Sequence, residues 1–204
     1  MSLLPNKDEY TYEEWLELDN NEDTELIEGI IYMRYGTQGG KLGGPSRRHQ
    51  KISRKLTREI SNFLVGKTCE PCEPCEPCEP CESCEPCELY YDLTVRLSKN
   101  TVVRPDISVI CDPDKLDDRG CNGPPDLIIE ILSPSNAGND LWTKYHQYLL
   151  AGVKEYWIVD PIKNEAIIYI LEAGKYRGTW YSEKGILPVT VLPGCEIDLN
   201  TIFA

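Results

Sequence analysis

Two apolar runs with an amphipathic stretch between them constrain the fold of this chain more than any other feature. Residues 126–132 read DLIIEIL, and residues 153–159 read VKEYWIV. Between them, residues 139–151 carry apolar side chains at helical spacing, and Gly152 follows as a helix terminator. Strand, helix and strand in this order predict an α/β fold, in which helices flank a mixed sheet with a buried centre.

The rest of the chain supplies further elements of the same kind. A capping box at Thr11 and Glu14 predicts a short helix over residues 11–18, and residues 46–65 have the clearest helical periodicity. Two strands that turn at Glu28 and Gly29 are expected within residues 24–34. Further strands are predicted at residues 89–97, 102–111, 166–171, 175–181 and 189–192, with polar connections at 37–45 and 112–125. A length of 204 residues suits a single domain over residues 1–204.

A cysteine–glutamate–proline repeat is inserted into this domain at residues 69–88. It reads CEPCEPCEPCEPCESCEPCE and holds seven of the ten cysteines; the others are Cys111, Cys121 and Cys195. Its low complexity favours a surface loop with no evolved role. The alternative is a metal- or thiol-responsive segment, because proline at every third residue favours polyproline II and would align the thiols along one side.

Charge and hydropathy argue against two broad classes of protein. The formal net charge is −13, and removing the seven glutamates of the repeat leaves about −6. A general nucleic-acid-coating protein is normally basic, so that class is not expected. No apolar run reaches about 18 residues, so no membrane association is expected. The first residues lack the basic start and long apolar stretch of a secretory signal, which makes the cytoplasm the expected location.

The predicted helix at residues 46–65 carries the only dense basic stripe of the sequence. Its charged residues recur about one turn apart and are Arg47, Lys51, Arg54, Lys55 and Arg58. A stripe of this kind can contact the phosphate backbone of a nucleic acid. The alternative, which spacing alone favours, is a solvated helix face.

Two carboxylates interrupt apolar strands. Asp106 follows Pro105 at the head of ISVI, and Glu130 lies within LIIEIL. An unpaired charge on a buried strand is costly, so a metal ion or a cationic side chain is expected to neutralise it. Paired Asp and Glu oxygens suit Mg²⁺. The alternatives are a salt bridge for Glu130 and a strand cap or turn for Asp106.

Lys144 lies on the predicted helix that follows Glu130. Asp140 precedes it by four residues, so a surface ion pair is one interpretation. However, Trp142, Tyr145 and Tyr148 make this helix largely apolar, and the lysine could therefore point inward toward the two carboxylates.

The combined pattern resembles the Uma-type restriction endonuclease family of the PD-(D/E)xK nuclease-like superfamily. The resemblance rests on RPDISVI, PPDLIIEILSPS, the D-x-x-x-K-Y helix and AGVKEYWIVDP, and extends to TELIEGIIYM and LPGCEIDLNTIF. The superfamily pattern places Glu-x-Lys on the second strand, but Leu132 occupies the lysine position here. In the Uma-type family the lysine role moves to the following helix, which implies Lys144.

The resemblance implies a restriction-endonuclease-like fold and a metal-dependent DNA endonuclease. Asp106 and Glu130 would bind Mg²⁺ or Mn²⁺, Lys144 would complete the catalytic set, and the weaker accessory candidates are Glu25, Asp126 and Asp140. The metal would activate water for phosphodiester hydrolysis. Because cutting both strands with a single-site domain usually needs two copies, a homodimer is the expected assembly.

Two other functions stay open at this stage. One is a nuclease-like module that binds nucleic acid or protein without cutting, which the acidic net charge and the missing Glu-x-Lys keep in view. The other is a metal- or thiol-responsive protein that acts through the cysteine repeat. The acidic residue at position 130 in an apolar strand favours the enzyme, because a chain that kept only the fold would not need it.

Overall fold

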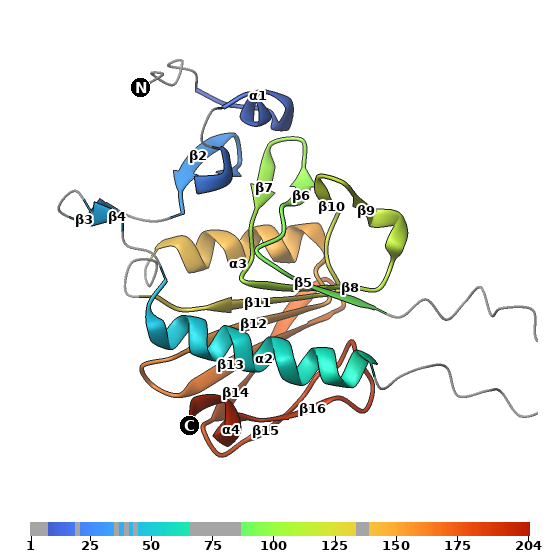
Figure 1. Cartoon of the computed structure of the whole chain (residues 1–204). Helices are drawn as coiled ribbons and strands as arrows, with labels where there is room; N and C mark the ends of the chain where they lie inside the picture. The colour runs from blue at the N-terminus through green and yellow to red at the C-terminus, as the bar shows by residue number, and fades with distance from the viewer. Residues whose placement is uncertain are drawn as a thin grey trace, which may run out of the picture.

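The computed structural model describes residues 8–18, 21–34, 37–38, 41–42, 45–65, 87–133 and 139–204. For residues 37–38, 41–42 and 139–141 it describes the backbone alone. Within these residues, two mixed sheets, two long helices and several short elements form an α/β structure (Figure 1).

The central sheet has six strands in the order β14-β13-β12-β11-β8-β5. Its members are β5 (Glu88–Tyr91), β8 (Ile107–Ile110), β11 (Leu127–Ile131), β12 (Glu155–Asp160), β13 (Glu165–Glu172) and β14 (Lys175–Ser182). Strands β11 and β12 are parallel and all other neighbours are antiparallel. Helix α3 (Asn139–Ala151) makes the crossover between the parallel pair, as the two apolar runs predicted.

Alternate residues of β11 face opposite helices, because successive side chains of a strand point to opposite faces. Ile129 packs with Ile52 and Leu56 of helix α2 (Arg47–Val65). Ile128 packs with Tyr148 of α3 on the other face. Glu130 has the parity of Ile128, so its carboxylate is directed toward α3.

A second sheet lies on the far side of α3 (Figure 1), in the order β2-β1-β7-β6-β10-β9. Its strands are β1 (Thr24–Ile27), β2 (Ile30–Met33), β6 (Val95–Ser98), β7 (Thr101–Val103), β9 (Leu116–Asp117) and β10 (Gly120–Asn122). Ile27 and Val103 share a buried cluster with Tyr148, so α3 is packed between the two sheets. Helix α1 (Tyr12–Leu16), with the predicted capping box, packs Trp15 against Leu26.

The remaining elements are short. They are the 3-10 helices η1 (Asn21–Asp23) and η2 (Pro113–Lys115), strands β3 (Thr37–Gln38), β4 (Lys41–Leu42), β15 (Ile186–Pro188) and β16 (Glu196–Asp198), and helix α4 (Leu199–Phe203). Among the described residues, no helix is long and apolar enough to cross a membrane.

Both long helices and the hairpin at Glu28 and Gly29 are confirmed, whereas two predicted strands are each divided in two. Residues 89–97 split into β5 and β6 because Asp92 adopts a positive φ of 55° and redirects the chain into the second sheet. Residues 102–111 split into β7 and β8 at Pro105, which has no N–H to donate to a ladder.

Two further predictions were wrong. Residues 189–192 form no strand: Val189 and Leu192 are apolar because both side chains are buried in the core beside a turn. Residues 112–125 were predicted only as a polar connection, but they contain η2 and the β9–β10 pair. The turn-forming residues of this segment do not predict the β9–β10 pair, because it depends on contact with the distant strand β6.

Only the end of the cysteine repeat lies within the described residues. Glu88 begins β5, and Cys87 forms a disulfide with Cys111, which follows β8. The other cysteines of the repeat, with the rest of residues 69–86, lie outside the described part. Disulfides are typical of oxidising compartments, and the cytoplasmic location expected from the sequence stays a prediction.

Helix α2 should contribute to stability mainly through its buried face. Leu56 is 1% exposed and packs in the central core, so Leu56→Ala should lower the free energy of unfolding by about 2–5 kcal/mol. Val65, at the end of the same helix, is 81% exposed, and Val65→Ala should change stability by no more than about 0.5 kcal/mol. Urea unfolding followed by circular dichroism measures both. Equal effects would contradict the packing described.

Candidate active site

The pairing of β8 with β11 brings the two strand carboxylates to one place. Ile107 pairs with Ile129, so Asp106 and Glu130 occupy the next positions along these antiparallel strands. The backbone N–H of Ile131 donates a 2.8 Å hydrogen bond to Oδ2 of Asp106, which fixes this carboxylate at the end of β11.

Lys144 points inward from α3 and binds two carboxylates. Its Nζ lies 2.9 Å from Oε1 of Glu25 and 3.1 Å from Oε1 of Glu130. All three residues are buried, at 6%, 3% and 7% exposure for Lys144, Glu25 and Glu130. The sequence left open whether Lys144 points to solvent or to the carboxylates, and the structure has it pointing to the carboxylates.

Tyr148 stands one helical turn after Lys144 and completes this cluster. Its hydroxyl donates a 2.7 Å hydrogen bond to Oε1 of Glu130, the oxygen that Lys144 also binds. Glu25 is held in turn by the backbone N–H of Arg104, at 2.8 Å. The buried cluster of Glu25, Glu130, Lys144 and Tyr148 therefore joins β1, β11 and α3.

His49 approaches Asp106 from the first turn of α2. Ser46 accepts a hydrogen bond from the backbone N–H of His49 and so caps the start of this helix. The imidazole Nε2 lies 3.0 Å from Oδ2 of Asp106, while the buried Nδ1 has no hydrogen-bond partner among the described residues. Asp106 is thus held on one oxygen by Ile131 and His49.

Burial governs the electrostatics of these groups. Desolvation raises the pKa of Glu130 to about 7; Lys144 opposes the shift, and the negative charges of Asp106 and Glu25 add to it. Burial lowers the pKa of His49, but its hydrogen bond to Asp106 and the charge of that carboxylate outweigh this effect, so the pKa is raised. Burial and the neighbouring Glu130 raise the pKa of Tyr148.

The donor set fits a hard divalent cation. Every hydrogen bond to Asp106 and Glu130 among the described residues ends on one oxygen, Oδ2 or Oε1, which leaves Oδ1 and Oε2 without a partner. A cation on those oxygens would relieve the repulsion that raises the pKa of Glu130. In the described part of the chain no three acidic, histidine or cysteine residues form a ready metal site, so waters would complete the shell, as is usual for Mg²⁺.

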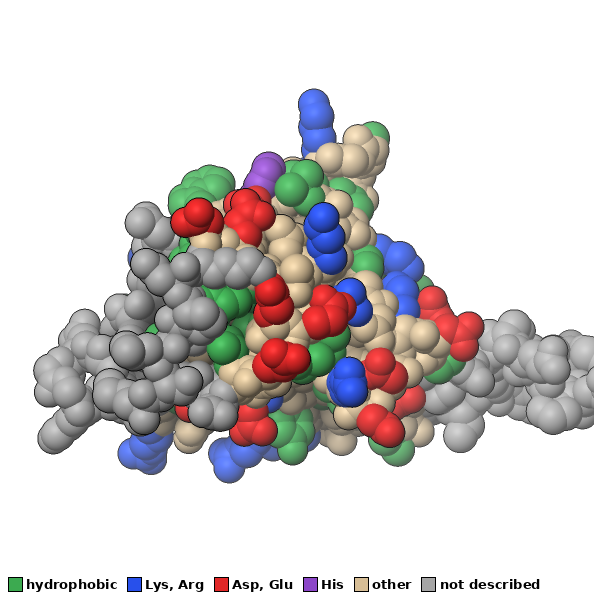
Figure 2. Space-filling model, turned by 90° about the horizontal axis from the view of Figure 1, so that it is seen from above, with side chains coloured by type: hydrophobic (Ala, Val, Ile, Leu, Met, Phe, Trp, Pro, Cys, Tyr) green, Lys and Arg blue, Asp and Glu red, His purple; other side chains and the backbone are tan. Residues whose placement is uncertain are grey.

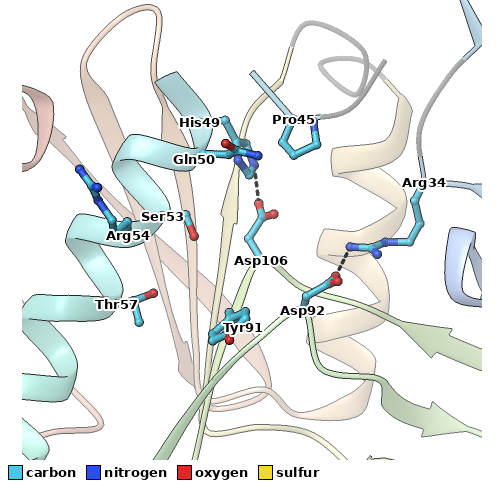
Figure 3. Close-up of a pocket in the computed structure, with 10 residues that line it drawn as sticks. All are labelled: Arg34, Pro45, His49, Gln50, Ser53, Arg54, Thr57, Tyr91, Asp92 and Asp106. Atoms are coloured by element: carbon cyan, nitrogen blue, oxygen red, sulfur yellow. Dashed lines mark hydrogen bonds and ion pairs between the residues drawn. The ribbon is translucent and has the colours of Figure 1, made fainter. Parts of the chain in front are cut away.

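A surface cavity of about 450 Å³ opens beside Asp106 (Figure 3). Its wall on α2 includes His49, and its far side carries Arg34, which is ion-paired with Asp92. The remaining lining residues are Pro45, Gln50, Ser53, Arg54, Thr57 and Tyr91. Asp106 is therefore reachable from solvent, and its side chain is 22% exposed.

The accessory candidate Asp126 does not join the cluster. Asp126 lies just before β11, four residues before Glu130, where it accepts a hydrogen bond from the Cys111 N–H and pairs with Lys154. These contacts fit its interpretation as a strand-start group. The side chain of Asp140 lies outside the described part of the structure.

The residues of the basic stripe on α2 lie in different environments. Lys51 and Lys55 donate to backbone carbonyls at the end of α4, at 2.7 Å from Ala204 and Thr201 respectively. Arg58 pairs with Glu59, and Arg47 lies on the surface near α4. Arg54 is the one residue of the predicted stripe that lines the cavity beside Asp106.

Sequence reasoning missed two contributors to this site. Tyr148 was taken only as an apolar residue of α3, although its position four residues after Lys144 indicates a shared helix face. The sequence assigned His49 no role in the site, because its contact with Asp106 depends on how α2 packs against the sheet.

Three comparisons identify similar proteins. A family model described as "Uma2: Putative restriction endonuclease" matches residues 10–200. The uncharacterized protein slr1290 of Synechocystis sp. is 28% identical over 138 residues, which are 67% of this chain and 59% of that protein's length. A crystal structure of a putative nuclease of DUF820 from Anabaena variabilis superimposes with a TM-score of 0.68 at 19% identity, over 95% of this chain and 97% of that one. It has the same restriction-endonuclease-like fold.

Removing the buried ammonium should destabilise the chain in a pH-dependent way. Lys144→Met leaves the buried carboxylates of Glu25 and Glu130 uncompensated and should cost about 3–5 kcal/mol at pH 8.5. A carboxyl group whose pKa is raised in the folded state stabilises the fold while it is protonated. This stability is lost as the pH rises from the unfolded-state pKa to the folded-state pKa. For Glu130 the folded-state pKa is about 7, and removal of Lys144 should raise it further, so the variant should lose less stability at pH 6 than at pH 8.5.

Urea unfolding at the two pH values tests this expectation. Lys154→Met is the matched control, since the Lys154 side chain is 67% exposed and its loss should cost less than about 1 kcal/mol. If Lys144→Met were no more destabilising than Lys154→Met, the buried ammonium would not be needed to compensate the charges of Glu25 and Glu130.

Proposed function

Because the chain belongs to the Uma2 family, whose description is a putative restriction endonuclease, we propose that it is a metal-dependent endonuclease that hydrolyses phosphodiester bonds in DNA. The observation that carries the proposal is the grouping of Asp106, Glu130 and Lys144, of which Asp106 lines a solvent-open cavity. Each residue comes from a different element, and these are the positions that the family resemblance implied.

The carboxylates are suited to hold Mg²⁺ or Mn²⁺ through Oδ1 of Asp106 and Oε2 of Glu130, which no group of the described residues occupies. Once bound, such an ion polarises the phosphate and lowers the pKa of a coordinated water. Asp106 is oriented for this by His49 and Ile131, which bind only Oδ2. Tyr148 and Lys144 orient Glu130 in the same way, through Oε1.

Lys144 supplies the positive charge that the Glu-x-Lys pattern would otherwise place at Leu132. Leu132 instead donates its backbone N–H to Val159 within the sheet. Glu25 holds the ammonium from the opposite side and so acts as a positioning residue. A preorganised ammonium next to the metal ligands can stabilise charge that develops on the phosphate during attack by water.

The main alternative is a nuclease-like module that binds nucleic acid without cutting it. The acidic net charge and the missing Glu-x-Lys pattern keep this alternative open. A metal- or thiol-based function of the repeat and a homodimeric assembly stay predictions from the sequence.

Nicking of supercoiled plasmid in Mg²⁺ or Mn²⁺ tests the enzymatic proposal. Asp106→Asn and Lys144→Met should each lower the cleavage rate by at least about 100-fold, because each removes a group that acts on the reacting phosphate or its metal. Asp114 is an exposed residue of η2, and the Asp114→Asn variant should cut like the native chain. If the native protein cuts no DNA substrate in either metal, the enzymatic proposal is wrong.

Metal affinity should depend on pH through Glu130. Its pKa of about 7 means that a cation must displace a proton below neutrality. The apparent affinity for Mn²⁺ should therefore rise by about tenfold per pH unit up to about pH 7 and then level off. Calorimetric titration of the native protein between pH 5.5 and 8.5 measures this, with Asp106→Asn as the variant that should bind weakly throughout. A pH-independent affinity would remove Glu130 from the ligand set.

A further inference from the structure

The cavity beside Asp106 has polar side chains in one part of its lining and an aromatic side chain in another. Along α2, Gln50, Ser53, Arg54 and Thr57 recur at intervals of three and four residues, so they share one face of the helix. Figure 3 shows Ser53 and Thr57 pointing from this helix toward the middle of the cavity, and Asp106 pointing toward His49 at its inner end. The wall formed by α2 therefore offers hydroxyl and amide groups, and Arg54 adds a guanidinium that points away from Asp106 in Figure 3; all of these groups can bind phosphate or sugar oxygens.

The opposite part of the cavity presents an aromatic ring. Tyr91 ends β5 and pairs with Ile107, the residue after Asp106. The tyrosine is 73% exposed. An exposed aromatic ring next to a polar wall is the combination that proteins use to stack a base while they bind its backbone.

Charge favours entry of a nucleic acid along α2. Arg54 is exposed, and no partner for it is found among the described residues. The face over α1 and the β6–β7 hairpin carries acidic and basic side chains interspersed (Figure 2). Arg34 is ion-paired with Asp92, so Arg54 is the cationic lining residue with no described partner to attract a phosphate.

The size and lining of the cavity favour an unpaired nucleotide over a DNA duplex. In a duplex, both faces of each base are covered by neighbouring base pairs, so no face is free to stack on Tyr91. An unpaired nucleotide has a free face and can be splayed into a recess. The cavity volume of about 450 Å³ lies in the range of sites that take one small molecule and does not match a duplex.

We propose that this cavity binds an unpaired nucleotide next to the cut phosphate, with its base on Tyr91 and its backbone on Arg54. The substrate would then be single-stranded DNA, or DNA with a locally unpaired strand. This inference rests on the proposed function in one respect, namely that Asp106 belongs to the cutting site. The binding preference itself does not require cleavage.

Fluorescence anisotropy in EDTA tests binding without cutting. A labelled single-stranded oligonucleotide should bind the native chain at least about tenfold more tightly than the blunt duplex of the same sequence. Tyr91→Ala should weaken single-strand binding by about 5- to 150-fold, the usual range for loss of one stacked base, while Tyr91→Phe should stay within about twofold. Arg54→Ala should weaken binding and reduce its salt dependence.

Two exposed residues of β14 provide matched controls. Trp180→Ala removes an exposed aromatic ring, and Arg177→Ala removes an exposed arginine. Neither residue lines the cavity, and both variants should bind single strands like the native chain. Equal affinity for duplex and single strand, or full binding by Tyr91→Ala, would overturn the inference.

Adding Mn²⁺ to the same samples separates this inference from the proposed function. Preferential cutting of the single strand would support both. Single-strand preference in EDTA without any cutting in Mn²⁺ would leave the cavity assignment supported and would contradict the nuclease. Cutting of duplex with no preference for unpaired strands would support the nuclease and overturn the cavity assignment.

Discussion

The ammonium of Lys144, buried between the carboxylates of Glu25 and Glu130, is the interaction on which the rest of this structure depends. Each partner comes from a different layer: the second sheet, the crossover helix and the central sheet. None of the three charges is tolerable alone at this depth, because an uncompensated buried charge is far more costly than the pair. The layers can therefore pack in only one relative position, and that position also sets Glu130 beside Asp106.

Much of this arrangement could be predicted from the sequence because it follows from local patterns. The period of apolar residues determined α2 and α3, and an acidic residue in an apolar strand marked Glu130 as a group that needs a cation. Lys144 was a candidate because it lies on the largely apolar helix after that strand, and the family resemblance implied that it takes the lysine role. These inferences depend only on residues close together in the chain.

What could not be predicted depends on contacts between distant segments. The chain leaves the central sheet at Asp92 and returns at Pro105, and neither change is visible without the second sheet that receives β6 and β7. The contact of His49 with Asp106 likewise spans 57 positions. Asp126 is the opposite case. Its position at the start of an apolar strand made it an accessory site candidate, but its partners are a backbone N–H and an exposed lysine.

The repeat interrupts the chain between two elements whose positions are fixed independently. Before it, α2 is anchored by its buried leucine and isoleucines; after it, β5 is registered on β8 and tied by the bond between Cys87 and Cys111. Adding or deleting whole triplets would alter the length of the insert without shifting either anchor. The register of β5 on β8 therefore places no constraint on the number of triplets, and chains with inserts of different lengths would keep the same two flanking elements.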